Sequence, residues 1–321
     1  MAGALAEEVV APDEADITAQ FVAFLKAATE KRHPSGVRRR FNQARATACV
    51  DAEFTVPEGV APEHRVGLFA SPRTYRASIR FANATSQTDR EPDVRGMALR
   101  VLGVDGAHLT PGVAHHDFIL NSHPVMMVPG TREFLELLRA NEAGGFQRIM
   151  YFLTHPRALR IGAAARSNPA CHLDLTYWST TPYRFGPGRA VKYVVAPSSP
   201  RRSPRPAART ATYLRDAMRT RLTDADATFD FMIQFQTDSR RMPIEDASVE
   251  WRSQDSPYVP VARIRIPRQS IDDPASDARC EQQGFNPWHC LAEHRPLGNM
   301  NRARREIYTA MASFRAETVG T

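Results

Sequence analysis

The stretch RFANATSQTDREPDVRGMALRVLGV, residues 80–104, joins two segments that have the pattern of β-strands. In residues 76–84 and 95–104, apolar side chains recur at every second position. The connection between them contains Asn, Ser, Asp and Pro, which are residue types that favour turns. The stretch therefore predicts two strands joined by a polar loop, as in an antiparallel sheet.

Segments with the same alternation lie on both sides of this stretch. They cover residues 50–56, 117–121, 172–180, 190–197, 229–236 and 262–267. Helical spacing of apolar side chains is found at 16–31, from Thr131 to Leu138, at 146–153, at 213–222 and in the terminal stretch 304–315. A strand-rich middle with helices on either side predicts an α+β protein, built as an antiparallel β-sheet or barrel with flanking helices.

The composition limits the classes of partner. The chain has 321 residues, 42% of them hydrophobic, and a formal charge of +7 that comes almost entirely from Arg. The arginines are scattered and no nucleic-acid motif accompanies them, so we predict an acidic ligand and no nucleic acid. No run of about 18 apolar residues is present, which predicts that no segment spans a membrane. The acidic first 16 residues do not have the pattern of a secretory signal, so we predict a cytoplasmic protein.

The four cysteines are widely spaced. Cys49, Cys171, Cys280 and Cys290 form no CxxC pair, so their spacing does not indicate zinc or dithiol chemistry. In a cytoplasmic protein, cysteines are expected to be reduced, and we predict four free thiols.

The C-terminal stretch places charged and aromatic side chains on one helical face. Arg304, Tyr308, Met311 and Arg315 are 4, 3 and 4 residues apart, which brings them to the same side of a helix. A guanidinium one turn from a phenol favours the phenolate form, and a tyrosine phenolate is a known axial ligand of haem iron. Taken alone, the same pattern also fits an amphipathic helix with a solvated Arg face.

Three ordered patterns carry a resemblance to a known family. Arg80 and Phe81 are followed by a variable loop, the sequence Asp-Val-Arg-Gly and an apolar strand. The second pattern is DFILNSHPVMMV, residues 117–128, and the third is the pair Arg304 and Tyr308. Together they resemble the haem-binding core of the catalase superfamily, and the segments FNPWH and EHRPLG resemble its smaller, catalase-like haem proteins. The resemblance implies a catalase-type antiparallel β-barrel with flanking helices and a haem b cofactor.

The resemblance also implies roles for individual residues. Tyr308 resembles the proximal ligand of the iron, and Arg304 resembles the cation that keeps this phenol ionised. Asn121 resembles the distal asparagine that binds a peroxide oxygen. The remaining matches are the propionate-binding arginines and the pocket-lining residues, namely Arg40, Arg80, Arg315, Phe134, Met126 and Met127.

The distal side departs from the family pattern. Catalases carry a histidine three residues after a propionate-binding arginine, ahead of the first barrel strand. Counting back from Phe54 places Arg40 and Gln43 at these positions, so we predict that Gln43 replaces the histidine. The nearest histidine, His33, lies ten residues too early and would have to reach the site along a different loop path.

This departure decides the predicted activity. Peroxide cleavage needs a side chain that moves a proton, and glutamine donates hydrogen bonds but is not a base. We therefore predict a haem-dependent oxidoreductase that acts on an organic substrate or organic hydroperoxide. The alternatives are a catalase or peroxidase that removes hydrogen peroxide, a haem carrier or sensor without turnover, and a nucleic-acid-binding protein without haem.

We predict two segments of the chain and its state of assembly. Residues 1–36 form an N-terminal helical arm, and residues 37–321 form the haem-binding domain. The resemblance implies assembly into homo-oligomers.

Overall fold

The structure is a computed structural model that describes residues 4–318. Eight strands form a closed antiparallel barrel in the order β5-β4-β3-β2-β1-β9-β8-β7, in which β5 also pairs with β7. The short strand β6 (Tyr183–Arg184) pairs with β7 outside this ring. The barrel strands are β1 (Ala46–Val56), β2 (Arg73–Asn83), β3 (Arg95–Leu102), β4 (His115–Asn121), β5 (Tyr177–Trp178), β7 (Ala190–Pro197), β8 (Ala227–Phe235) and β9 (Val259–Ile266).

Aromatic side chains fill the barrel. Phe54 of β1 stacks on Phe118 of β4 with ring centroids 6.3 Å apart, although these strands are not neighbours. Phe231 of β8 lies 4.8 Å from Phe118 and 5.3 Å from Phe54, and Tyr193 of β7 lies 5.0 Å from Phe118. Contacts between strands that do not pair must cross the interior, so the barrel is a packed core and leaves no room there for a cofactor.

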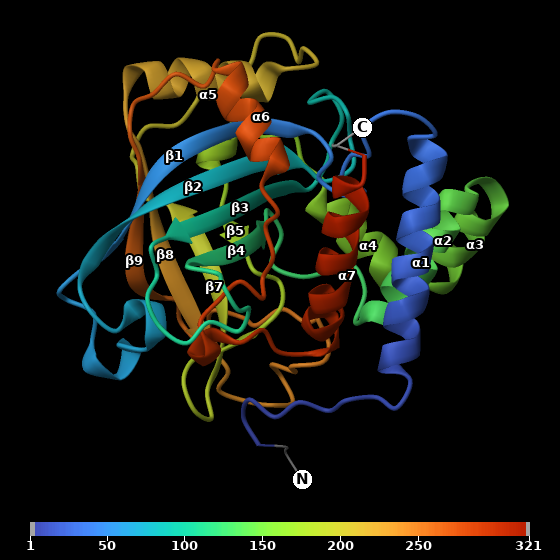
Figure 1. Cartoon of the computed structure of the whole chain (residues 1–321), viewed down its shortest axis with the longest axis horizontal. Helices are drawn as coiled ribbons and strands as arrows, with labels where there is room; N and C mark the ends of the chain where they lie inside the picture. The colour runs from blue at the N-terminus through green and yellow to red at the C-terminus, as the bar shows by residue number, and fades with distance from the viewer. Residues whose placement is uncertain (1–3, 319–321) are drawn as a thin grey trace.

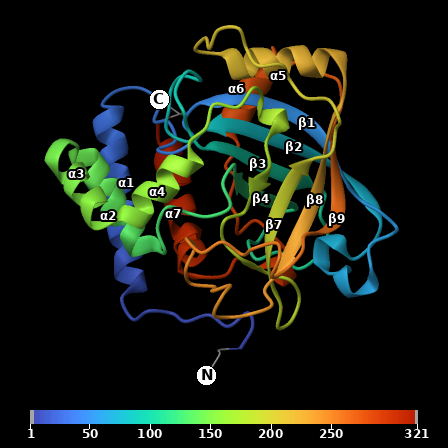
Figure 2. The same cartoon turned by 180° about the vertical axis from the view of Figure 1, so that it is seen from behind.

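Helices form a second layer beside the barrel. Figures 1 and 2 show α7 between the barrel and α1, with α3 on the far side of α1, and α5 and α6 at one end of the barrel. A second apolar cluster, which includes Phe21, Leu25, Leu135, Met311 and Phe314, joins α1, α2 and α7. The helices of the described residues are α1 (Glu14–Arg32), α2 (Thr131–Ala143), α3 (Gly145–Thr154), α4 (Pro156–Ala165), α5 (Tyr213–Asp224), α6 (Pro274–Gln282) and α7 (Asn299–Ala316), with 3-10 turns at Pro62–His64, Gly67–Phe69, His172–Asp174 and Ala292–His294.

The predicted α+β barrel with flanking helices is confirmed. One predicted strand, 172–180, is wrong for most of its length, because residues His172–Asp174 form a 3-10 turn and only Tyr177–Trp178 pairs. In this turn the buried His172 ring is hydrogen-bonded to Tyr177 Oη at 3.0 Å and Thr47 Oγ1 at 3.1 Å. These tertiary contacts outweigh the alternating pattern of the local sequence. No helix among the described residues is long and apolar enough to cross a membrane.

The predicted two-segment division is not tested by the structure. The helix of the proposed arm, α1, packs along α7 and contacts α2. The outer ends of both predicted segments, residues 1–3 and 319–321, lie outside the described residues.

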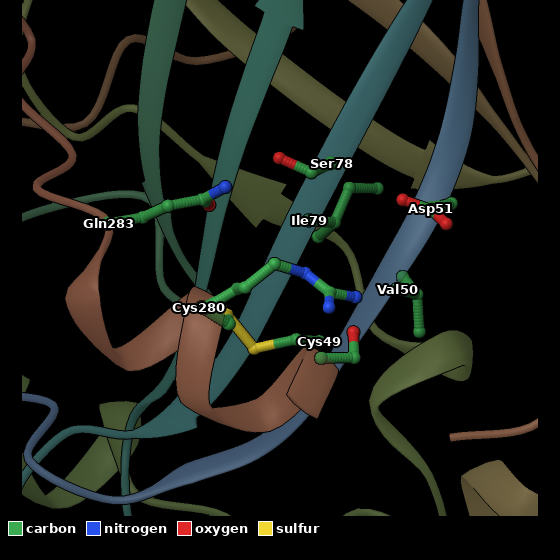
Figure 3. A pocket seen from close by; sticks show the side chains of 9 residues that line it. Cys49, Val50, Asp51, Ser78, Ile79, Cys280 and Gln283 are labelled. Atoms are coloured by element: carbon green, nitrogen blue, oxygen red, sulfur yellow. A yellow bond between two sulfur atoms is a disulfide. The ribbon is translucent and has the colours of Figure 1, made fainter. Parts of the chain in front are cut away.

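The prediction of four free thiols is wrong. Cys49 of β1 and Cys280 of α6 form a disulfide with a Cα–Cα distance of 6.2 Å, within the usual range for such bridges. Figure 3 shows the bond joining α6 to β1 beside a small hollow. Spacing of 231 residues gave no sequence signal for this pairing, because only the fold brings the two cysteines together. Cys171 and Cys290 are free and buried.

We predict that this disulfide contributes measurably to stability. Cys280→Ser is expected to lower the free energy of unfolding by about 2–4 kcal/mol, because the cross-link restricts a long loop in the unfolded chain. Urea denaturation under non-reducing conditions measures the change. The control is Cys171→Ser, which removes a buried thiol without removing a cross-link, and reductant should destabilise this control but not Cys280→Ser. Equal sensitivity of both variants to reductant would show that the bridge is absent.

Candidate functional site

Two arginines from distant parts of the chain pair with one carboxylate, and the charge of a third arginine interacts with it. Arg80 of β2 is 2% exposed, and its Nη2 donates to Glu281 Oε1 at 2.9 Å. Arg40 donates to the other carboxylate oxygen, Oε2, and its Nη2 donates to Gln283 O at 2.6 Å. The charge of Arg315 on α7 interacts with the charges of Glu281 and Arg80. We call these three arginines and Glu281 the arginine cluster.

Burial and mutual repulsion make the arginine cluster electrostatically costly. Burial, followed by the charge of Arg80, lowers the pKa of Arg40 to about 10, although Glu281 acts in the opposite direction. Burial also lowers the pKa of Arg315. Three guanidinium groups facing one carboxylate leave an excess of two positive charges. A ligand with two negative charges would neutralise this excess.

One donor in the cluster has no partner. The Nε of Arg80 is buried and makes no hydrogen bond within the described residues. Buried polar groups of proteins are nearly always paired, so an unpaired guanidinium nitrogen indicates a place where an acceptor can bind. The arginine cluster therefore has both the charge and the free donor that an acidic ligand needs.

The predicted distal pair is brought together. Gln43 Nε2 donates to Asn121 Oδ1 at 3.4 Å, and the backbone N–H of Gln43 donates to Ala84 O at 2.8 Å. Gln43 has a φ of 54°, a conformation that is uncommon for residues other than glycine. Its backbone oxygen accepts from Arg80 Nη2 at 2.8 Å, which links the pair to the arginine cluster.

Gly96 makes room for this pair. It lies opposite Asn121 in the β3–β4 ladder, and a Cβ at this position would lie 2.4 Å from Gln43 Nε2. His33, the alternative distal residue, follows the end of α1, where its backbone N–H caps the helix. No contact within the described residues joins His33 to Gln43 or Asn121.

On α7, Arg304 and Tyr308 are not directly bonded. The Arg304 guanidinium is buried, and its Nη1 donates to Thr181 Oγ1 at 3.2 Å and to Asn301 Oδ1 at 3.1 Å. It has no carboxylate partner within 4.0 Å among the described residues. Tyr308 is half-buried, and its hydroxyl makes no hydrogen bond in the described part of the chain.

A second tyrosine, Tyr183, lies close to both of these α7 residues. Its hydroxyl is buried and makes no hydrogen bond to any described residue. Burial raises its pKa to about 12, opposed by the charge of Arg304 and reinforced by Tyr308. The face of α7 thus holds one half-buried phenol beside an unneutralised guanidinium. Tyr308 and Arg315 are seven residues apart, or about 10 Å along this helix.

The predicted apolar lining lies partly in the helical layer. Phe134 packs edge-on against Phe21 with ring centroids 5.6 Å apart, between α1 and α2. Met127 lies against Gly162 of α4. Met126 is held by its backbone N–H, which donates to Ala247 O at 3.0 Å. These contacts give Phe134 and Met127 a role in packing, and their place in a ligand pocket stays a prediction.

A larger hollow opens next to the segment that follows Asn121. It has a volume of about 720 Å³, and its lining includes His123 and Val125 together with Ile161 and Ala164 of α4. Its charged lining consists of Arg157, Arg160, Arg240, Arg241, Arg252, Glu250 and Asp255. Five cations against two carboxylates make this hollow basic. The smaller hollow of Figure 3 contains none of the predicted site residues.

Two important residues were not predicted from sequence. Glu281 lies on α6, a helix in a region that lacks apolar periodicity. The signal that could have revealed this helix is Asp273 followed by Pro274, since Asp favours the N-cap and Pro the first helical position. Asp273 indeed accepts from the N–H groups of Ala275 and Ser276. Gly96 lies within the Asp-Val-Arg-Gly pattern, but only the strand register reveals what its missing side chain allows.

Comparison with solved structures identifies the architecture. A fungal catalase superposes with a TM-score of 0.69, and the match covers 98% of this chain and 66% of that catalase at 14% identity. Catalase A from Saccharomyces cerevisiae gives a TM-score of 0.69 at 15% identity over 98% of this chain and 67% of the other. The chain has a catalase-like fold.

A bacterial catalase also shares the catalase fold, with a TM-score of 0.68 and 16% identity over 90% of this chain and 59% of that one. The chain thus spans about two thirds of the length of these catalases. At such low identity the likeness establishes the fold alone. No protein-family model matches the sequence, and no curated protein matches it.

We predict that the placement of Gln43 can be tested through Gly96. Gly96→Ala is expected to destabilise the protein by about 1–3 kcal/mol, because the new methyl group overlaps the Gln43 amide. In a Gln43→Ala background most of this cost should vanish, and urea denaturation of the four proteins gives the coupling. Gly59→Ala is the control, since its Cβ would meet no atom within 4 Å. Purely additive effects would contradict the contact.

Proposed function

We propose that this chain is a haem-dependent oxidoreductase that acts on an organic substrate or organic hydroperoxide. The observation that carries the proposal is the arginine cluster, whose excess of two positive charges lies about two helical turns along α7 from Tyr308. Haem b has two propionates, and these would neutralise that excess. The catalase fold makes haem the expected cofactor for such an arrangement.

The residues present fit this group. Arg40, Arg80 and Arg315 would hold the propionates, and the unpaired Nε of Arg80 offers a donor that is already desolvated. Tyr308 would supply an oxygen ligand for the iron, since its hydroxyl has no hydrogen-bond partner among the described residues. Bound haem supplies a redox-active iron that reacts with peroxide oxygen.

Arg304 is suited to stabilise a phenolate at Tyr308. The nearby Arg302 of the same helix has its charge balanced by Glu8, Glu14 and Glu245. Arg304, in contrast, is bonded only to the neutral side chains of Thr181 and Asn301. A buried cation without a counter-charge is suited to stabilise a negatively charged oxygen one helical turn away, such as a phenolate that holds ferric iron.

Gln43 and Asn121 would hold the substrate oxygen on the distal side. Because Asn121 Oδ1 accepts from Gln43 Nε2, its own amide nitrogen remains available to donate. Neither side chain can take up a proton near neutral pH. The pair can therefore orient a bound oxygen, but it cannot shuttle the proton that hydrogen peroxide dismutation requires.

The basic hollow favours an organic substrate. Its volume of about 720 Å³ falls in the range of small-molecule sites and far exceeds the needs of hydrogen peroxide. Its excess of arginines favours a molecule that carries an acidic group. The second candidate function, a catalase or peroxidase acting on hydrogen peroxide, is favoured by the catalase fold itself. Homo-oligomers and a cytoplasmic location stay predictions.

We predict that haem binding depends on Tyr308. The purified protein should show a Soret band, and Tyr308→Phe should shift and weaken it strongly, because phenylalanine offers no ligand oxygen. Tyr75→Phe is the control, since Tyr75 is a half-buried tyrosine next to a cation, Arg73, but lies on β2 away from α7. A spectrum that is identical in all three proteins would refute tyrosinate ligation, and a protein without any Soret band after haem addition would refute the cofactor.

We predict that Gln43→His increases oxygen release from hydrogen peroxide. A distal base typically contributes about 10²–10⁴-fold to such a proton transfer, so the rise should be at least about a hundredfold. Oxygen-electrode assays of haem-loaded protein measure it, with Gln20→His on the exposed face of α1 as control. Vigorous oxygen release by the unmodified protein would instead support the catalase function.

A further inference from the structure

Three metal-ligating side chains converge outside the proposed haem site. His115 and Asp117 come from the start of β4, and His289 comes from the segment before α7. His115 Nε2 lies 3.1 Å from His289 Nδ1 and 3.7 Å from Asp117 Oδ2, and His289 Nδ1 lies 3.3 Å from Asp117 Oδ2. The backbone supports this convergence, because Asp117 N donates to His289 O at 2.8 Å.

The three separations match one face of a metal tetrahedron. Zinc binds nitrogen and oxygen ligands at about 2.0–2.2 Å, and a tetrahedron with such bonds has edges of about 3.3–3.6 Å. The two imidazole rings point at a common position, since their centroids are 5.0 Å apart while the facing nitrogens are 3.1 Å apart. A single ion can therefore lie at bonding distance from all three atoms.

Protons can satisfy these contacts only by sharing, with His289 Nδ1–H donating to Asp117 Oδ2 while an unprotonated His115 Nε2 faces the same N–H. His289 Nδ1 faces both an imidazole nitrogen and a carboxylate oxygen. If Nδ1 carries a proton, it donates to Asp117 and cannot also accept from His115 Nε2. If it carries none, it can accept from His115, but its lone pair then faces the carboxylate oxygen. A metal ion that replaces this proton would be attracted by the nitrogen lone pairs of both histidines and by the charge of the Asp117 carboxylate.

Surrounding groups fix the carboxylate and leave one side open. Arg100 donates to Asp117 Oδ1 and Oδ2 at 2.8 Å each, and Asn286 N donates to Oδ2 at 3.0 Å. Such outer hydrogen bonds are usual for ligating carboxylates. Arg100 also offsets the negative charge, so the two imidazoles dominate the affinity, which favours zinc over magnesium or calcium. The side chains of His115 and His289 are 21% and 20% exposed, so water can reach a fourth position.

We propose that His115, Asp117 and His289 form a zinc site. The ion would tie the start of β4, the strand that ends at Asn121, to the segment that leads into α7. The proposed zinc site does not depend on haem binding, because none of its three ligands belongs to the arginine cluster, the distal pair or the α7 face.

Metal analysis of the purified, haem-loaded protein tests this proposal. After incubation with zinc and desalting, one zinc ion per chain is expected, and zinc-edge X-ray absorption should report nitrogen and oxygen ligands at about 2.0–2.2 Å. His115→Gln and His289→Gln should each weaken zinc binding about tenfold or more. His64→Gln is the matched control, since His64 lies against Phe235 and outside the cluster. Zinc should also raise the melting temperature of the unmodified protein and of the control, and a chelator should reverse this rise.

The outcomes separate the possibilities. No stoichiometric zinc, or equal zinc binding by the two ligand variants and the control, would overturn the site. Circular dichroism checks that each variant is folded, and if a histidine variant does not fold, Asp117→Asn gives the same comparison. Tyr308→Phe should bind zinc as the unmodified protein does. The zinc measurement therefore tests the zinc site even if the haem proposal fails.

Discussion

The repulsion among one buried and two half-buried guanidinium groups is the constraint on which the site depends. Among the described residues, the Glu281 carboxylate pairs with Arg40 and Arg80, and its charge also attracts Arg315. Glu281 is itself positioned by α6, and the Cys49–Cys280 disulfide anchors this helix to β1 at the adjacent residue. A covalent bond and an ion pair thus maintain a local charge density that the chain would otherwise avoid.

The functional side chains lie outside the barrel core, at the ends of its strands. The barrel interior is closed by stacked aromatic rings, so functional side chains can gather only where strands end and helices begin. Arg80, Gly96 and Asn121 belong to the adjacent strands β2, β3 and β4, whose register sets their relative positions. The helical layer adds α7 on the other side. The rigid strand ends therefore fix the arginine and the asparagine, while α7 contributes the phenol.

Local patterns predicted much of this fold, and they failed where tertiary contacts decide. Alternation located seven of the eight barrel strands, since each buries one face, and helical spacing located α1, α2, α3, α5 and α7. Residues 172–180 were mispredicted because the His172 hydrogen bonds favour a turn. The order of three motifs led to the catalase fold and to Gln43 and Asn121, which the structure brings into contact. Sequence patterns could not predict the roles of Glu281, the disulfide and Gly96, because the residues that each of them contacts lie far away along the chain.

The order of the chain has a consequence for how the site is made. Arg40 and Gln43 lie near the start of the chain, whereas Glu281, Arg304, Tyr308 and Arg315 lie in its last 41 residues. Proteins are synthesised from the N-terminus, and early segments begin to fold while later ones are still being added. During synthesis, β1 to β4 can pair long before α6 and α7 leave the ribosome. The arginine cluster is thus completed only after α6 and α7 have been added, so any cofactor bound there is acquired after the strands β1 to β4 are available to pair.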